Sequence, residues 1–379
     1  MRPVVTVGLR PGALDAAERL GRPVVAVVEK PPGPKTAARL AGVVEAEFGA
    51  PPDRWRRVAD DLRALDPAAV VALTERSVVP AARLRHALGM GGLTVEAAVR
   101  CSDKRAMKRA ARAAGLACAD VVEADDGLTG AEVVERLGLP LVLKTAVGSG
   151  GRGTRIVVDP ADVPGRLAPG EMAESFVDGV EMSVETFVID GETVFANPTA
   201  YLAPGWASLV PAPLAPDVRD AVLAHAEAAR RALGVTSGMT HLEAFLTPDG
   251  PVFGELAARP PGGHLMPLLG LAYGVDPWEA VLRVALGETP ELPTRADRVA
   301  AARILHPGPG TVRAVEGVEA ARAMPGVEAV SVRVRAGVEV GPREGTGQEA
   351  GHVIVTGATA AQAEARLAAA AAAVRIEVA

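Results

Sequence analysis

Two glutamates in the last third of the chain have the residue type and spacing of metal ligands. Glu243 and Glu255 lie in two strand-like runs joined by Pro248-Asp249-Gly250, which is typical of a tight turn. A hairpin would place the two carboxylates side by side, where they repel each other unless a cation lies between them. Hard oxygen ligands of this kind suit Mg²⁺, which also binds substrate phosphates. The segment is interpreted as a site where a metal-bound nucleotide meets an anionic substrate; the alternative is a surface hairpin with two solvated glutamates.

A basic residue and a tight turn follow this hairpin, in the run Arg259-Pro260-Pro261-Gly262-Gly263-His264. The planar fork of Arg259 suits a carboxylate or phosphate, because it can donate two parallel hydrogen bonds. The backbone N–H groups of Gly262 and Gly263 could donate to a carboxylate or an oxyanion. We expect Arg259, Gly262, Gly263 and His264 to contact the substrate; a loop shaped only by proline and glycine is the alternative. A zinc site at His241 is not expected, since no further His or Cys has suitable spacing.

A glycine-rich loop follows the strand-like run that ends at Lys144. Gly148, Gly150 and Gly153 satisfy G-x-G-x-x-G, but β-branched residues follow instead of the helix that a dinucleotide site needs. A P-loop is excluded because no G-K-[ST] follows. A hairpin flap whose backbone N–H groups cover phosphates remains, with a surface turn as the alternative. Only five of the 40 basic residues are lysines, so Lys144 within a strand indicates that a compact charge is wanted there.

Two further segments could contact a nucleotide or a second substrate. Glu174, Phe176 and Val177 could hold a purine between backbone groups and an apolar wall, and Glu181 could bind ribose hydroxyls, although an amphipathic strand explains the pattern equally well. Residues 198–216 are proline-rich and are expected to be irregular, as in a loop that covers a site. Trp206 within them is our candidate for contact with the second substrate.

Composition sets the limits of these interpretations. A chain of 379 residues, 49% hydrophobic and 23% charged, is typical of a globular enzyme of two or three domains. The net charge of −6 argues against a nucleic-acid partner. The two cysteines, the lack of a signal-like N-terminus and the lack of a long apolar run predict a cytoplasmic protein without a membrane segment. Residues 1–95 alternate strand-like and helical stretches, as in a parallel α/β unit whose strand end at Val71–Glu75 faces a cleft.

The order of these motifs along the chain closely resembles that of the ATP-grasp superfamily, and within it the carboxylate–amine ligases related to L-amino acid ligases and biotin carboxylase. The likeness spans nearly the whole chain. It implies an α/β fold with a Rossmann-like N-terminal domain (1–98), a central two-lobed ATP-grasp domain (99–290) and a C-terminal α+β subdomain (291–379). The matching positions are Lys104, Lys144, the loop Gly148–Gly153, Glu174, Glu181, Glu243, Glu255 and Arg259.

The resemblance also implies roles for these residues. Lys104, Lys144 and the flap residues Ser149, Gly150, Gly151 and Gly153 would bind ATP with Glu174, Phe176, Val177 and Glu181. Glu243 and Glu255 would hold Mg²⁺, or Mn²⁺ in its place, and Arg259 and Glu255 would be catalytic. ATP would then convert a small carboxylate, such as that of an amino acid, into an acyl phosphate that an amine attacks, releasing ADP and phosphate.

Several alternatives stay open. The acceptor could be the thiol of a carrier protein, the product could be a stable phosphorylated compound, or the chain could bind ATP without catalysis. The family pattern Glu-x-Asn-x-Arg reads Glu255-Leu256-Ala257-Ala258-Arg259 here, so either a second metal lacks one ligand or a water takes the place of the Asn. Biotin carboxylase itself is disfavoured because no biotin-carrier module is evident. The expected partners are a small carboxylate and an amine, and a homodimer is left open.

Overall fold

The valine-rich runs at the start of the chain form the predicted parallel sheet. β1 (Val4–Val7), β2 (Val24–Val28), β3 (Gly42–Glu45) and β4 (Ala69–Ala72) pair in the order β3-β2-β1-β4. Every residue of β1 and β2 is buried, as expected for strands covered on both faces. The accompanying helices are α1 (Pro11–Arg19), α2 (Pro34–Ala37), α3 (Pro52–Arg63), the short η1 (Glu75–Ser77), α4 (Val78–Leu88) and α5 (Val95–Arg100). The computed structural model describes residues 1–343, 345 and 347–379.

A small lobe carries the glycine-rich loop. α6 (Lys104–Ala113) starts at Asp103, whose side chain accepts a hydrogen bond from the Arg105 N–H, as the sequence predicts. The lobe's four-stranded sheet has the order β5-β8-β6-β7. Its elements are β5 (Val121–Glu123), η2 (Ala124–Asp126), α7 (Gly130–Leu137), β6 (Leu141–Thr145), β7 (Arg155–Val157), η3 (Pro160–Asp162) and β8 (Glu171–Ser175).

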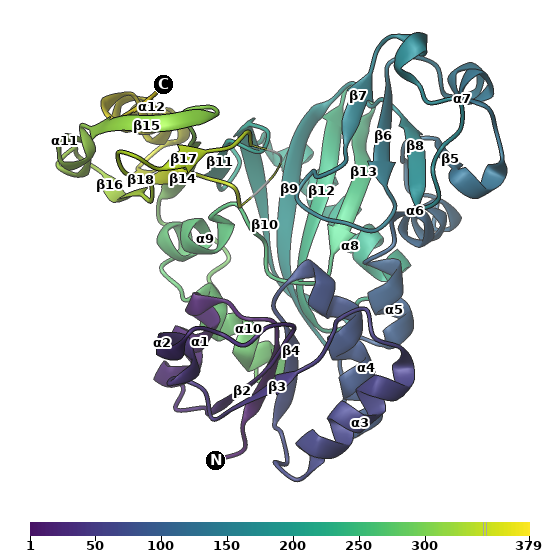
Figure 1. Ribbon diagram of the computed structural model, residues 1–379, viewed down its shortest axis with the longest axis vertical. Coiled ribbons are helices and arrows are strands. Elements are labelled where there is room, and N and C mark those ends of the chain that lie inside the picture. Colours follow the sequence, from purple (N-terminus) through teal and green to yellow (C-terminus); the bar gives the residue numbers. More distant parts are fainter. Residues whose placement is uncertain (344, 346) are drawn as a thin grey trace.

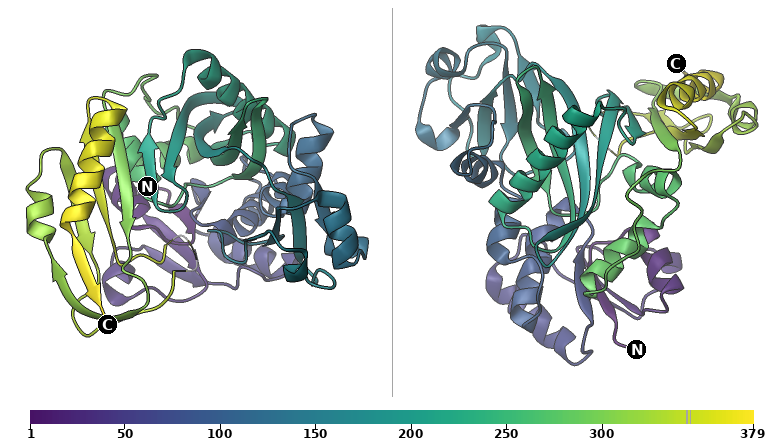
Figure 2. Two further views of the ribbon diagram at one scale, coloured as in Figure 1. Left: turned by 90° about the horizontal axis from the view of Figure 1, so that it is seen from above. Right: turned by 180° about the vertical axis from the view of Figure 1, so that it is seen from behind.

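An eight-stranded antiparallel sheet links this lobe to the C-terminal part of the chain (Figure 1). Its order is β13-β12-β9-β10-β11-β14-β18-β16, and α8 (Pro216–Leu233) crosses the face seen from behind in Figure 2. The sheet therefore continues across the predicted boundary at 290/291. Its strands are β9 (Val180–Ile189), β10 (Glu192–Ala203), β11 (Ala207–Val210), β12 (Gly238–Thr247), β13 (Gly250–Ala257), β14 (Val299–Leu305), β16 (Val327–Val332) and β18 (Gly351–Gly357).

The expectation that residues 198–216 are irregular is wrong for much of the segment, although residues 211–215 do lie outside helices and strands. β10 runs to Ala203, a tight turn contains Trp206, and β11 begins at Ala207. Pro198 lies inside β10, and its carbonyl accepts a hydrogen bond from the Ala212 N–H at 2.7 Å. The N and O atoms of one strand residue point to the same side, so the missing N–H of Pro198 faces away from β9 and costs no bond there.

The remaining helices join the bodies together. α9 (Leu265–Tyr273) packs against β14, and α10 (Pro277–Ala285) packs against α1 and β4 of the N-terminal sheet. The C-terminal part adds α11 (Val318–Arg322), α12 (Ala360–Ala373) and a small sheet of β15 (Gly310–Glu316), β17 (Glu339–Val340) and β19 (Arg375–Val378). None of the helices in the described part of the chain has the length and apolar character needed to cross a bilayer.

The hairpin of β12 and β13 has the register that the sequence predicts. Glu243 lies directly opposite Glu255, and the register shifts by one residue between Glu243 and Ala244. The extra residue is Gly254, where a Cβ atom would lie 2.6 Å from the Glu243 carbonyl oxygen. Glycine at this bulge therefore lets the two strands approach closely enough to pair the two acids.

Candidate active site

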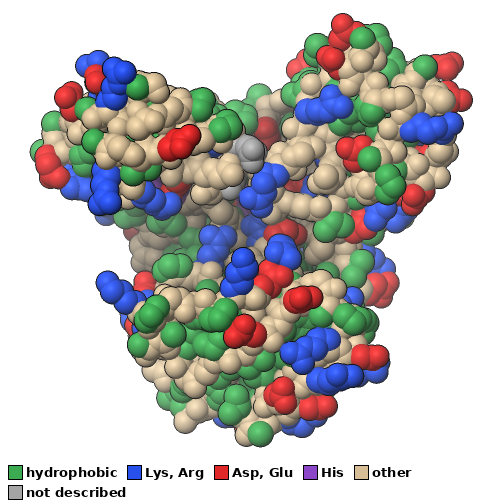
Figure 3. All heavy atoms as spheres, in the orientation of Figure 1, with side chains coloured by type: hydrophobic (Ala, Val, Ile, Leu, Met, Phe, Trp, Pro, Cys, Tyr) green, Lys and Arg blue, Asp and Glu red, His purple; other side chains and the backbone are tan. Residues whose placement is uncertain are grey.

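The predicted site residues converge on one cavity of about 840 Å³ between the small lobe, the large sheet, the N-terminal sheet and the C-terminal subdomain. Figure 3 shows the molecular surface hollowed between the two upper bodies, with basic and acidic side chains gathered below the hollow. Two predicted residues, Gly153 and His264, do not line the cavity. Those that do are Lys104, Lys144, Ser149, Gly150, Gly151, Glu174, Phe176, Val177, Glu181, Trp206, Glu243, Glu255, Arg259, Gly262 and Gly263.

Three carboxylates meet at the centre of the cavity. Burial and the charges of Glu243 and Glu255 raise the pKa of Glu181 to about 7. Burial, together with Glu243, also raises the pKa of Glu255 against the pull of Lys104 and Lys144. Uncompensated repulsion of this kind would be relieved by a divalent cation. The oxygen donors of Glu243 and Glu255, opposite each other on adjacent strands, therefore fit Mg²⁺ or Mn²⁺.

A buried hydrogen-bond network connects Glu243 through His241 to Glu185. His241 Nε2 lies 3.4 Å from Glu243 Oε1, and His241 Nδ1 lies 2.9 Å from Glu185 Oε1. Glu185 is fully buried and accepts further hydrogen bonds from Ser183, Asn197 and Thr199. Burial alone would lower the pKa of His241, but its hydrogen bonds to the two glutamates raise that pKa to about 9. A protonated imidazole therefore bridges Glu185 and Glu243, an arrangement that the sequence did not reveal.

The charge of His241 also acts on Glu243 itself. Burial favours the neutral form of Glu243, but the hydrogen bond and positive charge of His241, with smaller contributions from Arg259 and Lys144, lower its pKa. Glu243 is thus held ionised while its neighbour Glu255 is pushed toward protonation. Glu243 therefore has the charge needed to bind a cation, and a bound cation would stabilise the ionised form of Glu255.

Two lysines lie close to one glutamate at the end of the cavity formed by the small lobe. Lys144 Nζ lies 2.6 Å from Glu174 Oε2, and Lys108 Nζ lies 3.3 Å from the same oxygen. Lys108, which the sequence analysis left without a role, is almost completely buried and also donates to the Phe253 carbonyl oxygen at 3.2 Å. Burial lowers the pKa of Lys108, and Glu174 opposes this shift. One oxygen of Glu174 therefore lies close to both lysine ammonium groups.

The helix lysine connects the flap to the metal acids. Lys104 Nζ donates to the Gly148 carbonyl oxygen at 3.0 Å and lies 3.4 Å from Glu255 Oε2. The loop that it holds leads from β6 into β7, so the strand–turn–strand unit is confirmed and no helix follows the glycines. Gly150, Gly151 and Gly153 all have φ near +70°, a conformation that L side chains rarely adopt. The motif is therefore a hairpin flap.

The predicted substrate arginine is paired with an acid from another domain. Arg259 Nε lies 2.9 Å from Glu75 Oε2, and both side chains are mostly buried at the cavity wall. Glu75 follows β4 at the strand end that the sequence predicts to face a cleft. Arg10 lines the same wall, and burial, with the charge of Arg259, lowers its pKa. An anion and a cation thus stand side by side at this end of the cavity.

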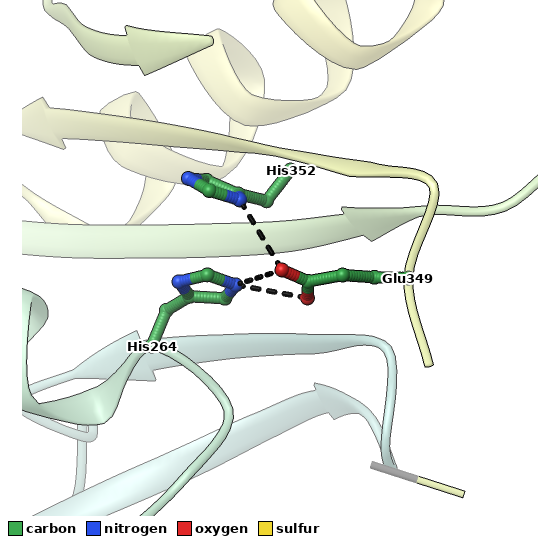
Figure 4. Close-up of side chains that lie close together, drawn as sticks. All are labelled: His264, Glu349 and His352. Atoms are coloured by element: carbon green, nitrogen blue, oxygen red, sulfur yellow. Dashed lines mark hydrogen bonds and ion pairs between the residues drawn. The ribbon is translucent and has the colours of Figure 1, made fainter. Parts of the chain in front are cut away.

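His264 lies behind the cavity wall instead of in it. Its Nε2 lies 2.9 Å from Glu349 Oε2, and its ring centroid is 3.9 Å from that of His352 (Figure 4). The ligating atoms of these three residues lie within 4.8 Å of one another, a spacing that a cation could use. Arg333 already lies 2.9 Å from Glu349 Oε1, however, and its guanidinium disfavours a second cation. The cluster is better explained as a bridge between α9 and β18.

Comparisons with known proteins agree with this geometry. Residues 103–190 match the family model of the carbamoyl-phosphate synthase L chain ATP-binding domain, and residues 303–379 match that of L-amino acid ligase C-terminal domain 2. The L-arginine-specific L-amino acid ligase of Bacillus subtilis is 27% identical over 244 residues, which cover 59% of each chain. An uncharacterised protein of Sinorhizobium fredii is 29% identical over 295 residues, or 73% of this chain and 61% of that one. The chain thus spans about three fifths of the length of these curated relatives.

The fold matches solved structures along its whole length. The L-amino acid ligase of Bacillus licheniformis superposes with a TM-score of 0.84 at 22% identity, covering 100% of this chain and 99% of that one. This likeness shows that the chain has the fold of these ligases, and the two matching models agree with the resemblance to the ATP-grasp superfamily. The curated relatives and the solved structures that match the chain thus both include an L-amino acid ligase.

Replacing one metal acid by its amide tests the metal assignment. Glu255→Gln keeps the size of the side chain but removes its charge, so we expect it to abolish ADP formation and to weaken Mg²⁺-dependent ATP binding. Glu123→Gln, an acid on β5 outside the cavity, is the matched control. Calorimetry and an ADP assay provide the measurements, and full activity of Glu255→Gln would refute the assignment.

The His241 bridge predicts a pH dependence of stability in the metal-free protein. Its pKa of about 9 lies above the ordinary 6.5, so the stabilisation is fully present below about pH 6.5 and is lost as the pH rises through 9. Such a shift corresponds to about 3 kcal/mol. We expect the free energy of unfolding in urea with EDTA to fall more steeply from pH 7 to 10 in the wild type than in His241→Asn. Equal slopes would contradict a protonated His241.

Proposed function

We propose that the chain is an ADP-forming ligase that activates the carboxylate of an amino acid and joins it to an amine. The observation that carries this proposal is the Glu75–Arg259 pair at 2.9 Å, in the same cavity as the metal acids. The pair presents one negative and one positive group, which match the ammonium and carboxylate groups of an amino acid. An acid without an amino group would use only the Arg259 end of this pair. The name of the Bacillus subtilis relative, an L-arginine-specific L-amino acid ligase, is consistent with such a substrate.

One end of the cavity would bind ATP, and the other would bind the carboxylate substrate. Lys104, Lys144 and the flap N–H groups would bind the phosphates of ATP, and Phe176 and Val177 would contact the base. Mg²⁺ held by Glu243 and Glu255 would neutralise charge on the phosphates during transfer. Arg259 would orient the attacking carboxylate and then bind the oxygen on which negative charge develops. Closure of the flap would keep water from the acyl phosphate.

A single cation suits this site better than two. Ala257, which stands where the family has Asn, lies directly opposite His241 in the strand register. Its small side chain leaves that space to the imidazole, whose positive charge acts on Glu243. We therefore infer that His241 supplies some of the charge compensation that a second cation would otherwise provide.

Release of ADP that requires two substrates tests the proposal. Each of the twenty amino acids, alone and in pairs, is added with ATP and Mg²⁺, and ADP and phosphate are measured. Acids without the amino group, such as propionate against alanine, test the role assigned to Glu75. We expect ADP release to be matched by an equal amount of amide product. ADP release without an amide product would instead support a phosphorylated end product, and ATP binding without ADP release would support a binding module.

A conservative change at Arg259 tests the catalytic role. Arg259→Lys keeps the charge but loses the fork, so we expect kcat to fall by about 10²–10³-fold with little change in ATP affinity. Arg303→Lys, an exposed residue on β14, is the control. Near-native turnover of Arg259→Lys would show that Arg259 is only the ion-pair partner of Glu75.

A further inference from the structure

A second guanidinium borders the cavity, on the side formed by the C-terminal subdomain. Arg343 and Trp206 both line the cavity there, with Ala302 and Ile304 of β14 beside them. The Arg343 Cζ atom lies 4.4 Å from the centroid of the Trp206 ring, and its Nη2 donates to the Gly205 carbonyl oxygen at 2.5 Å. Stacking and one backbone contact hold the guanidinium plane in a fixed orientation.

This guanidinium lacks an anionic partner within the part of the chain that the structure describes. Its Nε is buried and has no hydrogen-bond partner there, and none of the ion pairs between described residues includes Arg343. Arginine removed from water is normally paired with a carboxylate or a phosphate. Arg259 satisfies this rule through Glu75. Arg343 is therefore an oriented cavity arginine whose remaining hydrogen-bonding capacity is open to a ligand anion.

Two described residues that follow Arg343 in the chain, Gly345 and Glu349, contact other parts of the site. A Cβ atom at Gly345 would lie 2.4 Å from the Gly150 carbonyl oxygen, so the backbone there is in contact with the flap. Farther along, Glu349 is hydrogen-bonded to His264, which immediately follows the Gly262-Gly263 turn (Figure 4). The part of the chain just after Arg343 thus contacts both the flap and the residue that follows the Gly262-Gly263 turn.

We propose that Arg343, stacked on Trp206, binds the carboxylate of the amine substrate, so that the acceptor is itself an amino acid or a peptide. The inference rests on the proposed function, in which Arg259 already binds the acid that is activated. The face of Trp206 that lines the cavity offers an apolar surface to the acceptor's side chain, while Arg343 fixes its carboxylate end. Because the same segment contacts the flap, acceptor binding and flap position are coupled at Gly345.

Acceptors with and without a carboxylate distinguish this role from a structural one. KM and kcat are measured for the wild type, Arg343→Ala and Arg343→Lys with amino acids as acceptors and with the corresponding amino acid amides. We expect Arg343→Ala to raise KM at least tenfold for the amino acids and less than threefold for the amides, since a charge-assisted hydrogen bond is lost only with the former. Arg343→Lys should recover part of the loss, and KM for ATP should not change.

Arg335→Ala is the matched control, because it removes an exposed arginine of the same subdomain that does not line the cavity. Circular dichroism confirms that each variant is folded. If Arg343→Ala affects amino acids and amides equally, or affects neither, the subsite is refuted although the ligase activity stands. If the wild type joins no pair of substrates, the proposed function fails, and the subsite fails with it.

Discussion

Repulsion between carboxylates that are withdrawn from water is the constraint on which the rest of the site depends. Glu181, Glu243 and Glu255 raise one another's energy when ionised, and this raises the pKa of Glu181 to about 7. The protein compensates from two sides, with protonated His241 behind Glu243 and Lys104 beside Glu255. The negative charge that these groups leave unbalanced would be balanced by a divalent cation bound to phosphates. The proposed metal–nucleotide complex would bring positive charge to the acids and negative charge to the lysines.

The scaffold places these charges through close backbone contacts. The bulge at Gly254 brings Glu255 opposite Glu243, and Lys104 ties the beginning of the flap to the same acid. The N-terminal sheet supplies Glu75 from the end of β4, because α10 packs against that strand and α1 and fixes the sheet beside the large one. The C-terminal subdomain supplies Arg343 and, through the His264–Glu349 contact, supports the turn after Arg259. All parts of the chain thus contribute charge to one cavity.

Local sequence signals were sufficient for much of this arrangement. The β12–β13 hairpin, the flap and the helix at Lys104 follow from turn residues, β-branched runs and an N-cap, each visible within a few residues. The contacts of Glu185, Lys108 and Arg343 could not be predicted in this way, because their partners lie far away in the sequence. The Trp206 segment was misjudged because proline was taken to exclude a strand, although its N atom faces away from β9. His264 was placed correctly in a turn, but its side chain points toward Glu349, a residue that shows no local signal.

The path of a single oxygen atom tests the account most directly. If the acid is activated as an acyl phosphate, the oxygen of its carboxylate that attacks ATP leaves with phosphate when the amine forms the amide. The acid selected by the ADP-release screen is labelled with ¹⁸O in its carboxylate, and the phosphate released in unlabelled water is analysed by mass spectrometry. The account predicts one ¹⁸O atom in the phosphate for each amide formed. Phosphate that carries no label would contradict it.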